Sequence, residues 1–489
     1  MTDESDRSAR EADDATRGSA VKLTAEVASR LLGVGTTLLL LRGLGASDFG
    51  LFGVLSVYAL LLAELGELGL QALASRALVA GTLSLESLVR ARLALAAVVT
   101  AAAVAAIPLA PALALRLGGG TVDGPVLALL VAWFALSGWG EFIGVALRCR
   151  RARRLEAGLL LVLRGGALVF AAAALRLGMG LRGVAGALAL STLPALALGA
   201  ARLRRTSAPL AGPSVPPAAV LRESAPLAVH GGLLLLSPRV EFLVVSWLVA
   251  DREAVGLFYA ALTVVWVLSM APGAVAAGAM PALTREALQG GTAVRRRTAA
   301  TLALFGAPAA VGLALVAGPV AVLLLGTGYA PSGYAGAAAL LRLLSAAVPA
   351  LFLNALLLAS LIAAGRASWL PRITAARVAL AFALAFCLVP VLGPRGGALG
   401  LVVAEWLLLA GAAVMCREAA FPVPVLRPLA WALAACVPMV LAVSGVSGVS
   451  ASLVLAVPVG ALTYAATLAC AWRLVPGFAR GLSADLRYP

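Results

Sequence analysis

The chain has 489 residues, of which 62% are hydrophobic and only 12% are charged. Soluble domains are about half apolar, so this composition excludes a water-soluble globular protein. The formal net charge of +16 comes from 38 Lys and Arg residues against 22 Asp and Glu residues. Most of the basic residues lie in short clusters between apolar runs, which favours membrane lipids and excludes nucleic acid as the partner.

In chain order, the sequence begins with a polar tail at residues 1–20, where acidic residues mix with arginines. This pattern is wrong for a signal peptide and predicts a disordered cytoplasmic tail. Each apolar run that follows is long enough for a membrane-spanning helix, which needs about 20 residues. We therefore predict an all-α integral membrane protein with about 14 transmembrane helices, near residues 22–43, 50–72, 91–112, 125–147, 157–176, 183–201, 224–249, 255–280, 299–325, 336–364, 370–391, 397–415, 427–446 and 450–471.

The basic residues of the connections are distributed unequally between the two sides of the membrane. The side that holds the N-terminus carries most of them, with Arg76, Arg90 and Arg92 in one inner connection. The other side has only Arg42, Arg116, Arg176, Arg182, Arg252 and Arg395. By the positive-inside rule we expect a multi-pass protein of the cell membrane with both termini in the cytoplasm. The outward loops are short, so we expect the activity to lie within the bilayer or at its inner face.

Two segments of the chain resemble each other. GASDFGLFGVLSVY begins at Gly45 and DREAVGLFYAALTV begins at Asp251, and each is a short outward turn followed by Gly-Leu-Phe and an apolar helix. Duplicated bundles of this kind are common in transporters, where the substrate site lies at the interface of the repeats.

The first segment also resembles the Wzx-type polysaccharide flippases of the multidrug/oligosaccharidyl-lipid/polysaccharide exporter superfamily. The family pattern is an Arg-Xaa-Leu-Gly turn followed by an acidic-Phe-Gly step, and the run RGLGASDFG at residues 42–50 contains both. The second segment departs from this pattern, because Ala254 and Val255 precede Gly256.

The resemblance implies a transporter rather than an enzyme. It implies two pseudo-symmetric six-helix lobes that face a central cavity, two extra C-terminal helices, and alternating access that moves a lipid-linked oligosaccharide from the inner to the outer leaflet. The expected partners are a lipid-linked saccharide, membrane lipids and enzymes of polysaccharide biosynthesis. The expected domains are a tail at 1–20, an N-terminal lobe at 21–205, a linker at 206–222, a C-terminal lobe at 223–416, two helices within 417–475 and a cytoplasmic tail at 476–489.

Arginines inside the predicted spans are candidate substrate-binding residues. Ionisable groups at membrane depth are costly, so they are expected to face a bundle interior or a cavity. A guanidinium binds phosphate through two parallel hydrogen bonds and keeps its charge, which suits the pyrophosphate of a lipid-linked sugar. The candidates are Arg30, Arg164, Arg239 and Arg342. The alternative is that each pairs with a glutamate, as Glu26 does with Arg30 or Glu241 with Arg239, to fix helix packing.

Carboxylates inside the spans are candidates to bind a coupling ion, because a buried Glu can exchange a proton or hold sodium as a cavity opens. These are Glu141, Glu241 and Glu405.

Other polar positions in the spans have more than one interpretation. His230 is either a packing residue or a proton relay, and Glu64 and Glu67 either line a cavity or close a helix interface. Arg377 lies near an inner helix end, where we expect it to extend to the headgroups. Pro238, next to Arg239, predicts a flexible point.

Two other functions compete with the flippase. A drug exporter of the same superfamily would present an acidic cavity to cationic drugs, which the arginines in the spans disfavour. A membrane glycosyltransferase or polysaccharide polymerase would need catalytic residues in substantial loops. No cofactor or metal site is expected, because the cysteines and the single histidine lack metal-ligand spacing: Cys149, Cys387, Cys416, Cys436, Cys470 and His230.

Overall fold

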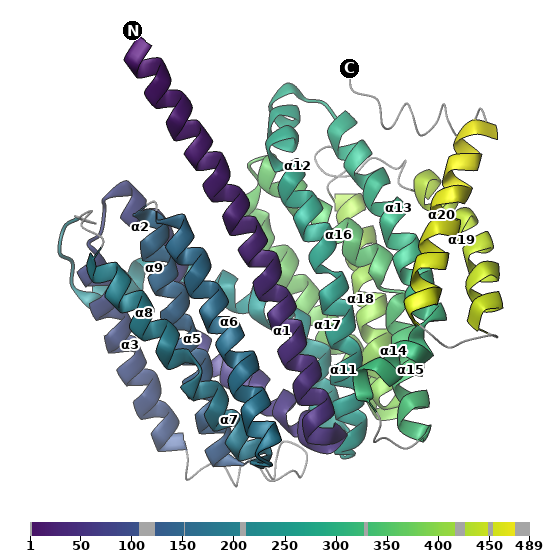
Figure 1. Cartoon of the computed structure of the whole chain (residues 1–489), viewed down its shortest axis with the longest axis horizontal. Helices are drawn as coiled ribbons and strands as arrows, with labels where there is room; N and C mark the ends of the chain where they lie inside the picture. Colours follow the sequence, from purple (N-terminus) through teal and green to yellow (C-terminus); the bar gives the residue numbers. More distant parts are fainter. Residues whose placement is uncertain are drawn as a thin grey trace. The chain divides into compact units, whose positions relative to one another are not determined.

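The fold is that of a helical membrane protein, as the sequence predicts. The computed structural model describes residues 2–106, 123–150, 152–205, 212–326, 331–415, 426–447 and 453–474, and within these ranges it contains helices and no strand (Figure 1). The described helices form two compact units, Met1–Leu236 and Ser237–Pro489.

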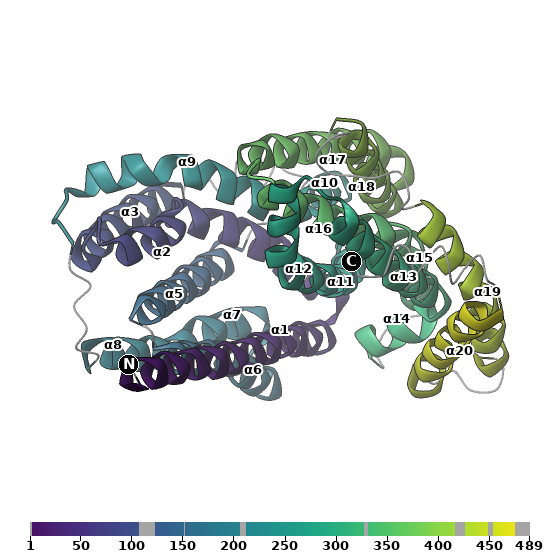
Figure 2. The same ribbon diagram turned by 90° about the horizontal axis from the view of Figure 1, so that it is seen from above.

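The first unit contains eight described helices. They are α1 (Thr2–Leu65), α2 (Leu70–Ala80), α3 (Leu85–Ala106), α5 (Gly124–Cys149), α6 (Arg153–Arg176), α7 (Gly180–Leu190), α8 (Thr192–Arg205) and α9 (Pro217–Leu236). Helix α1 packs against α5 and α6, and α5 packs in turn against α7 and α8. Helix α9 lies beside α2 and α3 (Figure 2).

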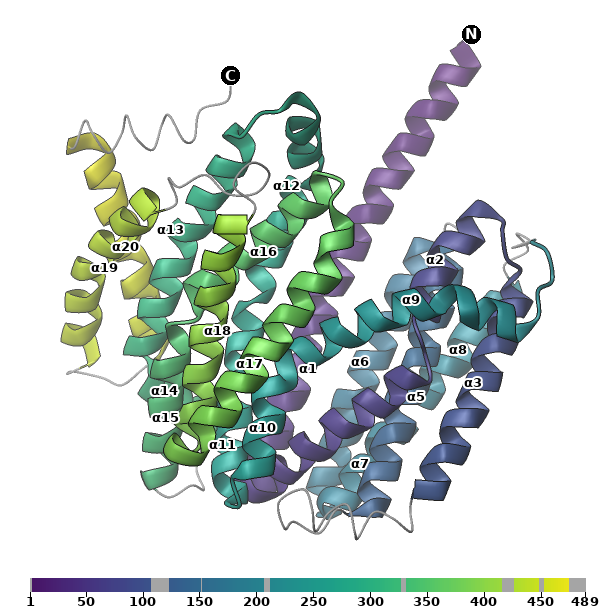
Figure 3. The same cartoon turned by 180° about the vertical axis from the view of Figure 1, so that it is seen from behind.

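The second unit begins with a short 3-10 turn, η2 (Ser237–Arg239). Its helices are α10 (Val240–Leu248), α11 (Arg252–Leu268), α12 (Met270–Gln289), α13 (Ala293–Leu315), α14 (Ala317–Leu325), α15 (Pro331–Ser345), α16 (Val348–Ala363), α17 (Leu370–Leu392), α18 (Pro394–Met415), α19 (Leu426–Ser447) and α20 (Leu453–Leu474), with the 3-10 turn η3 (Ala367–Trp369) before α17. Helices α17 and α18 lie side by side and pack against α10 (Figure 3). The C-terminal pair α19 and α20 packs against α13, where the Tyr464 hydroxyl donates to the Leu304 carbonyl over 2.7 Å.

Most of the predicted spans coincide with long apolar helices. Among the described residues, nine helices are long and apolar enough to cross a membrane, and ten if the bent pair α15 and α16 counts as one span. The other four predicted spans fall on α3, α18, α19 and α20. The exact number of crossings and the domain boundaries remain predictions, and the expected tail at 476–489 and linker residues 206–211 lie outside the described residues.

Glycines set the contact between α1 and α6. Gly165 faces Leu32, Gly35 faces Leu168, and a β carbon at Gly43 would lie 2.5 Å from Leu175 Cδ1. The residue numbers rise together along both helices, so the two helices run parallel. Small residues let helix backbones approach closely in a membrane, where the hydrophobic effect does not drive helix association.

Three breaks interrupt the helical chain. The first lies in a turn that the sequence predicts between two spans, and the other two lie inside predicted spans. Gly45 has φ 78° and ψ 167° and separates the two halves of α1. Leu68 and Gly69 both have positive φ, and they end the irregular turn between α1 and α2. The third break is η2, where the apolar segment Pro217–Leu248 passes from α9 to α10. Its central residue is Pro238, which supplies no backbone N–H and so disrupts a helix.

Candidate functional site

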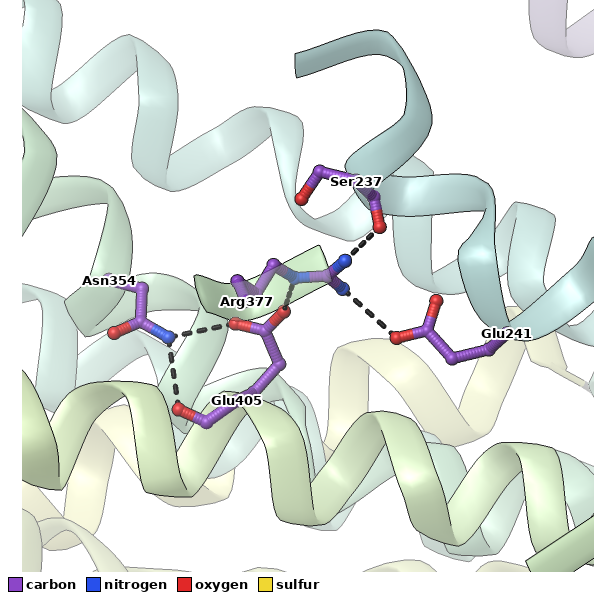
Figure 4. A network of polar contacts seen from close by, with 5 residues as sticks. All are labelled: Ser237, Glu241, Asn354, Arg377 and Glu405. Atoms are coloured by element: carbon purple, nitrogen blue, oxygen red, sulfur yellow. Dashed lines mark hydrogen bonds and ion pairs between the residues drawn. The ribbon is translucent and has the colours of Figure 1, made fainter. Parts of the chain in front are cut away.

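A buried network of charged side chains in the second unit joins four helices and the η2 turn. At its centre is Arg377 of α17, which lies between Glu241 of α10 and Glu405 of α18 (Figure 4). Asn354 of α16 completes the group on the far side of Glu405. The helices that carry these residues pack against one another, which brings into contact groups up to 140 residues apart in the sequence.

Arg377 uses three of its guanidinium nitrogens in this network. Nε donates to Glu405 Oε1 over 2.8 Å, and Nη2 donates to Glu241 Oε1 over 3.2 Å. Nη1 donates to the carbonyl of Ser237, which belongs to η2. Asn354 Nδ2 donates to Glu405 Oε2 over 2.8 Å and to the Glu405 carbonyl over 3.1 Å.

The network is almost completely enclosed by protein. Relative exposure is 0% for Glu241, 3% for Glu405, 8% for Arg377 and 5% for Asn354. Two of its buried oxygens, Glu241 Oε2 and Asn354 Oδ1, have no hydrogen-bond partner. Such unsatisfied groups are rare in folded proteins, and each one calls for a physical explanation.

A second buried ion pair lies in the first unit. Arg92 of α3 donates from Nη2 to Glu67 Oε1 over 2.5 Å, and Glu67 belongs to the irregular turn between α1 and α2. The Arg92 guanidinium carbon lies 4.8 Å from the ring centroid of Trp139 and 5.0 Å from that of Phe142, both in α5. These contacts add cation–π attraction to the ion pair.

Two of the predicted substrate-binding arginines lie at the same level on adjacent helices. Arg164 of α6 pairs with Glu141 of α5 over 3.2 Å, and the two side chains are 39% and 38% exposed. Arg30 of α1 pairs with Glu26 over 3.1 Å, with exposures of 45% and 44%. The contact between Leu32 and Gly165 places both arginines at one level of the parallel α1 and α6 helices. In both ion pairs the carboxylate bonds to Nη2 of the arginine.

The other two predicted arginines lie in the second unit. Arg239 ends η2, and its guanidinium carbon lies 5.8 Å from the ring centroid of Trp266. Arg342 of α15 has an exposed side chain. The three carboxylates predicted to bind a coupling ion separate into two groups, because Glu241 and Glu405 share Arg377 whereas Glu141 pairs with Arg164. His230 of α9 has a buried Nδ1 without a hydrogen-bond partner.

Two expectations about arginines are wrong. Arg377 does not extend to the headgroups, because it is buried and bonds to two carboxylates on neighbouring helices. Arg92, counted by sequence among the residues of an inner loop, is 2% exposed within α3. The Glu26–Arg30 pair is confirmed. In the described part of the chain, no group of three or more His, Cys, Asp or Glu residues is placed to hold a metal ion.

Solved transporter structures share this fold. A structure described as the lipid II flippase MurJ in an inward closed conformation superposes with a TM-score of 0.75 at 12% identity, over 93% of this chain and 99% of the other. An inward-facing multidrug-resistance MATE transporter of the MOP superfamily gives 0.62 at 17% identity, over 81% and 97%. A MOP superfamily transporter from Pyrococcus furiosus, whose binding pocket is described as having reverse polarity, gives 0.53 at 18% identity, over 83% and 94%. No protein-family model and no curated protein matches the sequence.

Proposed function

We propose that this protein is a flippase that moves a lipid-linked oligosaccharide or polysaccharide precursor from the inner to the outer leaflet by alternating access. The observation that carries the proposal is its similarity to the lipid II flippase structure, which extends over 93% of the chain, compared with 81% for the MATE transporter. The more complete match favours a lipid-linked substrate over a small drug.

The arginines of the first unit offer chemistry that suits such a substrate. Arg30 and Arg164 lie at one level of adjacent helices, and both side chains are more than one-third exposed. Each guanidinium group can bind a phosphate oxygen of such a headgroup, because each provides several N–H donors beyond the one used by its glutamate. We propose that the headgroup displaces Glu26 and Glu141 from these arginines when it binds. Arg239 and Arg342 are the corresponding candidates in the second unit.

A drug exporter of the same superfamily is the alternative within this fold. Cationic drugs need unpaired carboxylates, since a carboxylate that already pairs with arginine offers little attraction to a second cation. Here Glu67, Glu141, Glu241 and Glu405 each pair with an arginine. These four carboxylates therefore offer little attraction to a cationic drug. The structural neighbours are transporters and flippases, so a glycosyltransferase or polymerase is supported by no neighbour.

The test is translocation of a fluorescent lipid-linked oligosaccharide in proteoliposomes, read by quenching with a membrane-impermeant reagent. We expect the wild type to flip the lipid, and Arg30→Ala and Arg164→Ala to slow flipping about tenfold each, the equivalent of about 1.4 kcal/mol of lost headgroup binding. Arg182→Ala is the matched control, because Arg182 is an exposed arginine paired with Asp123 at the start of α5 and has no place in the proposed site.

Two outcomes would contradict the proposed function, and a third would contradict the proposed substrate site. Wild-type protein that exports cationic drugs and moves no lipid-linked sugar would be a drug exporter. Transfer of sugar to an acceptor in the same vesicles would identify an enzyme. Flipping that is unaffected by both arginine substitutions would remove Arg30 and Arg164 from the substrate site while leaving the flippase itself supported.

A further inference from the structure

The charge of the buried network in the second unit does not balance if both of its carboxylates are ionised. Arg377 contributes one positive charge, and Glu241 and Glu405 would contribute two negative charges. All three are at least nine-tenths buried. A net charge in such an environment is strongly unfavourable, and a buried carboxyl group avoids it by taking up a proton.

The hydrogen bonds distinguish the two carboxyl groups. Both oxygens of Glu405 accept hydrogen bonds, Oε1 from Arg377 and Oε2 from Asn354, as expected of an ionised carboxylate. Glu241 receives one bond, from Arg377 to Oε1, and its Oε2 has no donor at all. A protonated carboxyl needs no donor on the oxygen that carries the hydrogen. Glu241 is therefore the group better suited to hold a proton.

We propose that Glu241 is a proton-binding site whose Oε2 takes up one proton from water, while Arg377 and Glu405 remain ionised. No covalent bond other than the new O–H bond forms or breaks, and the net charge of the network changes from −1 to zero. Arg377 occupies the position between the carboxylates that a metal cation would need. The ligand of this site is consequently a proton and not sodium.

Charged and titratable groups surround Glu241 on every element that packs against α10. Helix α17 supplies Arg377 and α18 supplies Glu405, while η2 carries Arg239. Helix α11 carries Tyr259, whose ring centroid lies 4.6 Å from that of Phe242, the residue after Glu241. Arg377 forms an ion pair with the Glu241 carboxyl group over 3.2 Å.

The same arginine connects the proton site to the break in the helix. Arg377 binds Glu241 through Nη2 and the Ser237 carbonyl through Nη1, and Ser237 begins the 3-10 turn between α9 and α10. Protonation of Glu241 weakens its attraction for the Arg377 guanidinium. The guanidinium is then held less firmly, which alters its hydrogen bond to the Ser237 carbonyl. Coupling of the proton to movement of this break rests on the proposed transport function, whereas proton binding itself does not.

Proton binding can be measured without any substrate by infrared difference spectroscopy of the purified full-length protein at neutral pH. We expect one band from a protonated carboxyl group, and its loss in Glu241→Gln. Glu405→Gln should lose the band too, because Glu241 alone then balances the charge of Arg377. Glu141→Gln, which changes a half-exposed glutamate of the first unit, is the control that keeps the band.

Two further measurements identify the proton carrier and the ligand. Asn354→Leu should leave the band position unchanged, since Asn354 contacts Glu405 alone of the two glutamates; a shift would assign the proton to Glu405 and overturn the proposal. Melting temperature should be the same in sodium and in N-methylglucamine salts at equal ionic strength. A sodium-dependent rise that disappears in Glu241→Gln, or a wild type without the carboxyl band, would also overturn it, and neither result depends on whether the protein flips lipid.

Discussion

Arg92 and Glu67 form a buried ion pair across the first unit, with 2.5 Å between Nη2 and Oε1. The pair ties α3 to the irregular turn that separates α1 from α2, and the rings of Trp139 and Phe142 lie within cation–π distance of the guanidinium. Arg92 Nη1 is buried without a hydrogen-bond partner, so the hydrogen bonding of the guanidinium is incomplete. Its main role in this structure is to fix the position of the turn.

Removal of the cation from this pair should destabilise the protein. Arg92→Leu leaves Glu67 with no counter-charge in a largely buried position, and breaking a buried pair in this way costs about 3 kcal/mol or more. The double variant Arg92→Leu with Glu67→Gln removes both charges and should recover much of the loss. Reversible denaturation in mixed micelles measures both free energies of unfolding. Equal losses in the single and double variants would contradict this account.

Gly138 is predicted to be intolerant of any side chain. A β carbon there would lie 1.9 Å from Glu67 Oε1 and 2.9 Å from Arg92 Nη2, so Gly138→Ala must displace the ion pair. We expect a destabilisation of about 1–3 kcal/mol, the usual cost of overpacking. Gly158→Ala in α6 is the matched control, since nothing lies within 4 Å of its added carbon. The control should be neutral or stabilise by up to about 1 kcal/mol, as alanine is the better helix former.

Arg377 is predicted to be the most sensitive single residue of the second unit. Arg377→Met leaves two buried carboxylates with no cation, and we expect a loss of about 3–5 kcal/mol in the free energy of unfolding. Arg372→Met is the control on the same helix, where the side chain is exposed and the expected change is within about 0.5 kcal/mol. Thermal unfolding of the two variants side by side checks the difference. Similar melting temperatures would show that the network contributes little to stability.

The orientation in the membrane is predicted from the basic residues of the connections and can be tested by labelling. Ser47 lies at the expected outer surface and Gln289 at the expected inner surface, and both side chains are exposed. In a cysteine-free background, Ser47→Cys should react with a membrane-impermeant maleimide added to intact cells. Gln289→Cys should react only after the membrane is permeabilised. The reverse pattern would place both termini outside the cell.

The helical fold could be predicted from the sequence because a segment that crosses a membrane must satisfy its own backbone hydrogen bonds. A sufficiently long apolar run therefore predicts a helix. The pairing of Arg30 with Glu26 was predictable for a similar reason, since a spacing of four residues brings two side chains together on one helix face. Both inferences use local information, and neither requires knowledge of which helices are neighbours.

The buried networks were not accessible in this way. Arg377 is 136 residues from Glu241 and 28 from Glu405, so its partners depend on helix packing that no local spacing indicates. Arg92 was misassigned because it was grouped with Arg90, two residues before it, among the basic residues of an inner connection. In the structure the two side chains diverge: Arg90 is half-exposed near Glu86, whereas Arg92 is buried. A helical-face comparison of these two positions was the available signal, because Arg92 shares its face with the apolar Leu88 and Leu95.

Gly45 has a mechanical consequence for the first two spans. Its φ of 78° and ψ of 167° lie in a region that is essentially restricted to glycine, and helical residues adjoin it on both sides. The segments Thr24–Gly45 and Ser47–Ala80 are therefore joined by almost no slack chain. A displacement of the first span at Gly45 therefore also displaces the start of the second span, and a change in the angle between the two spans requires rotation about the Gly45 backbone.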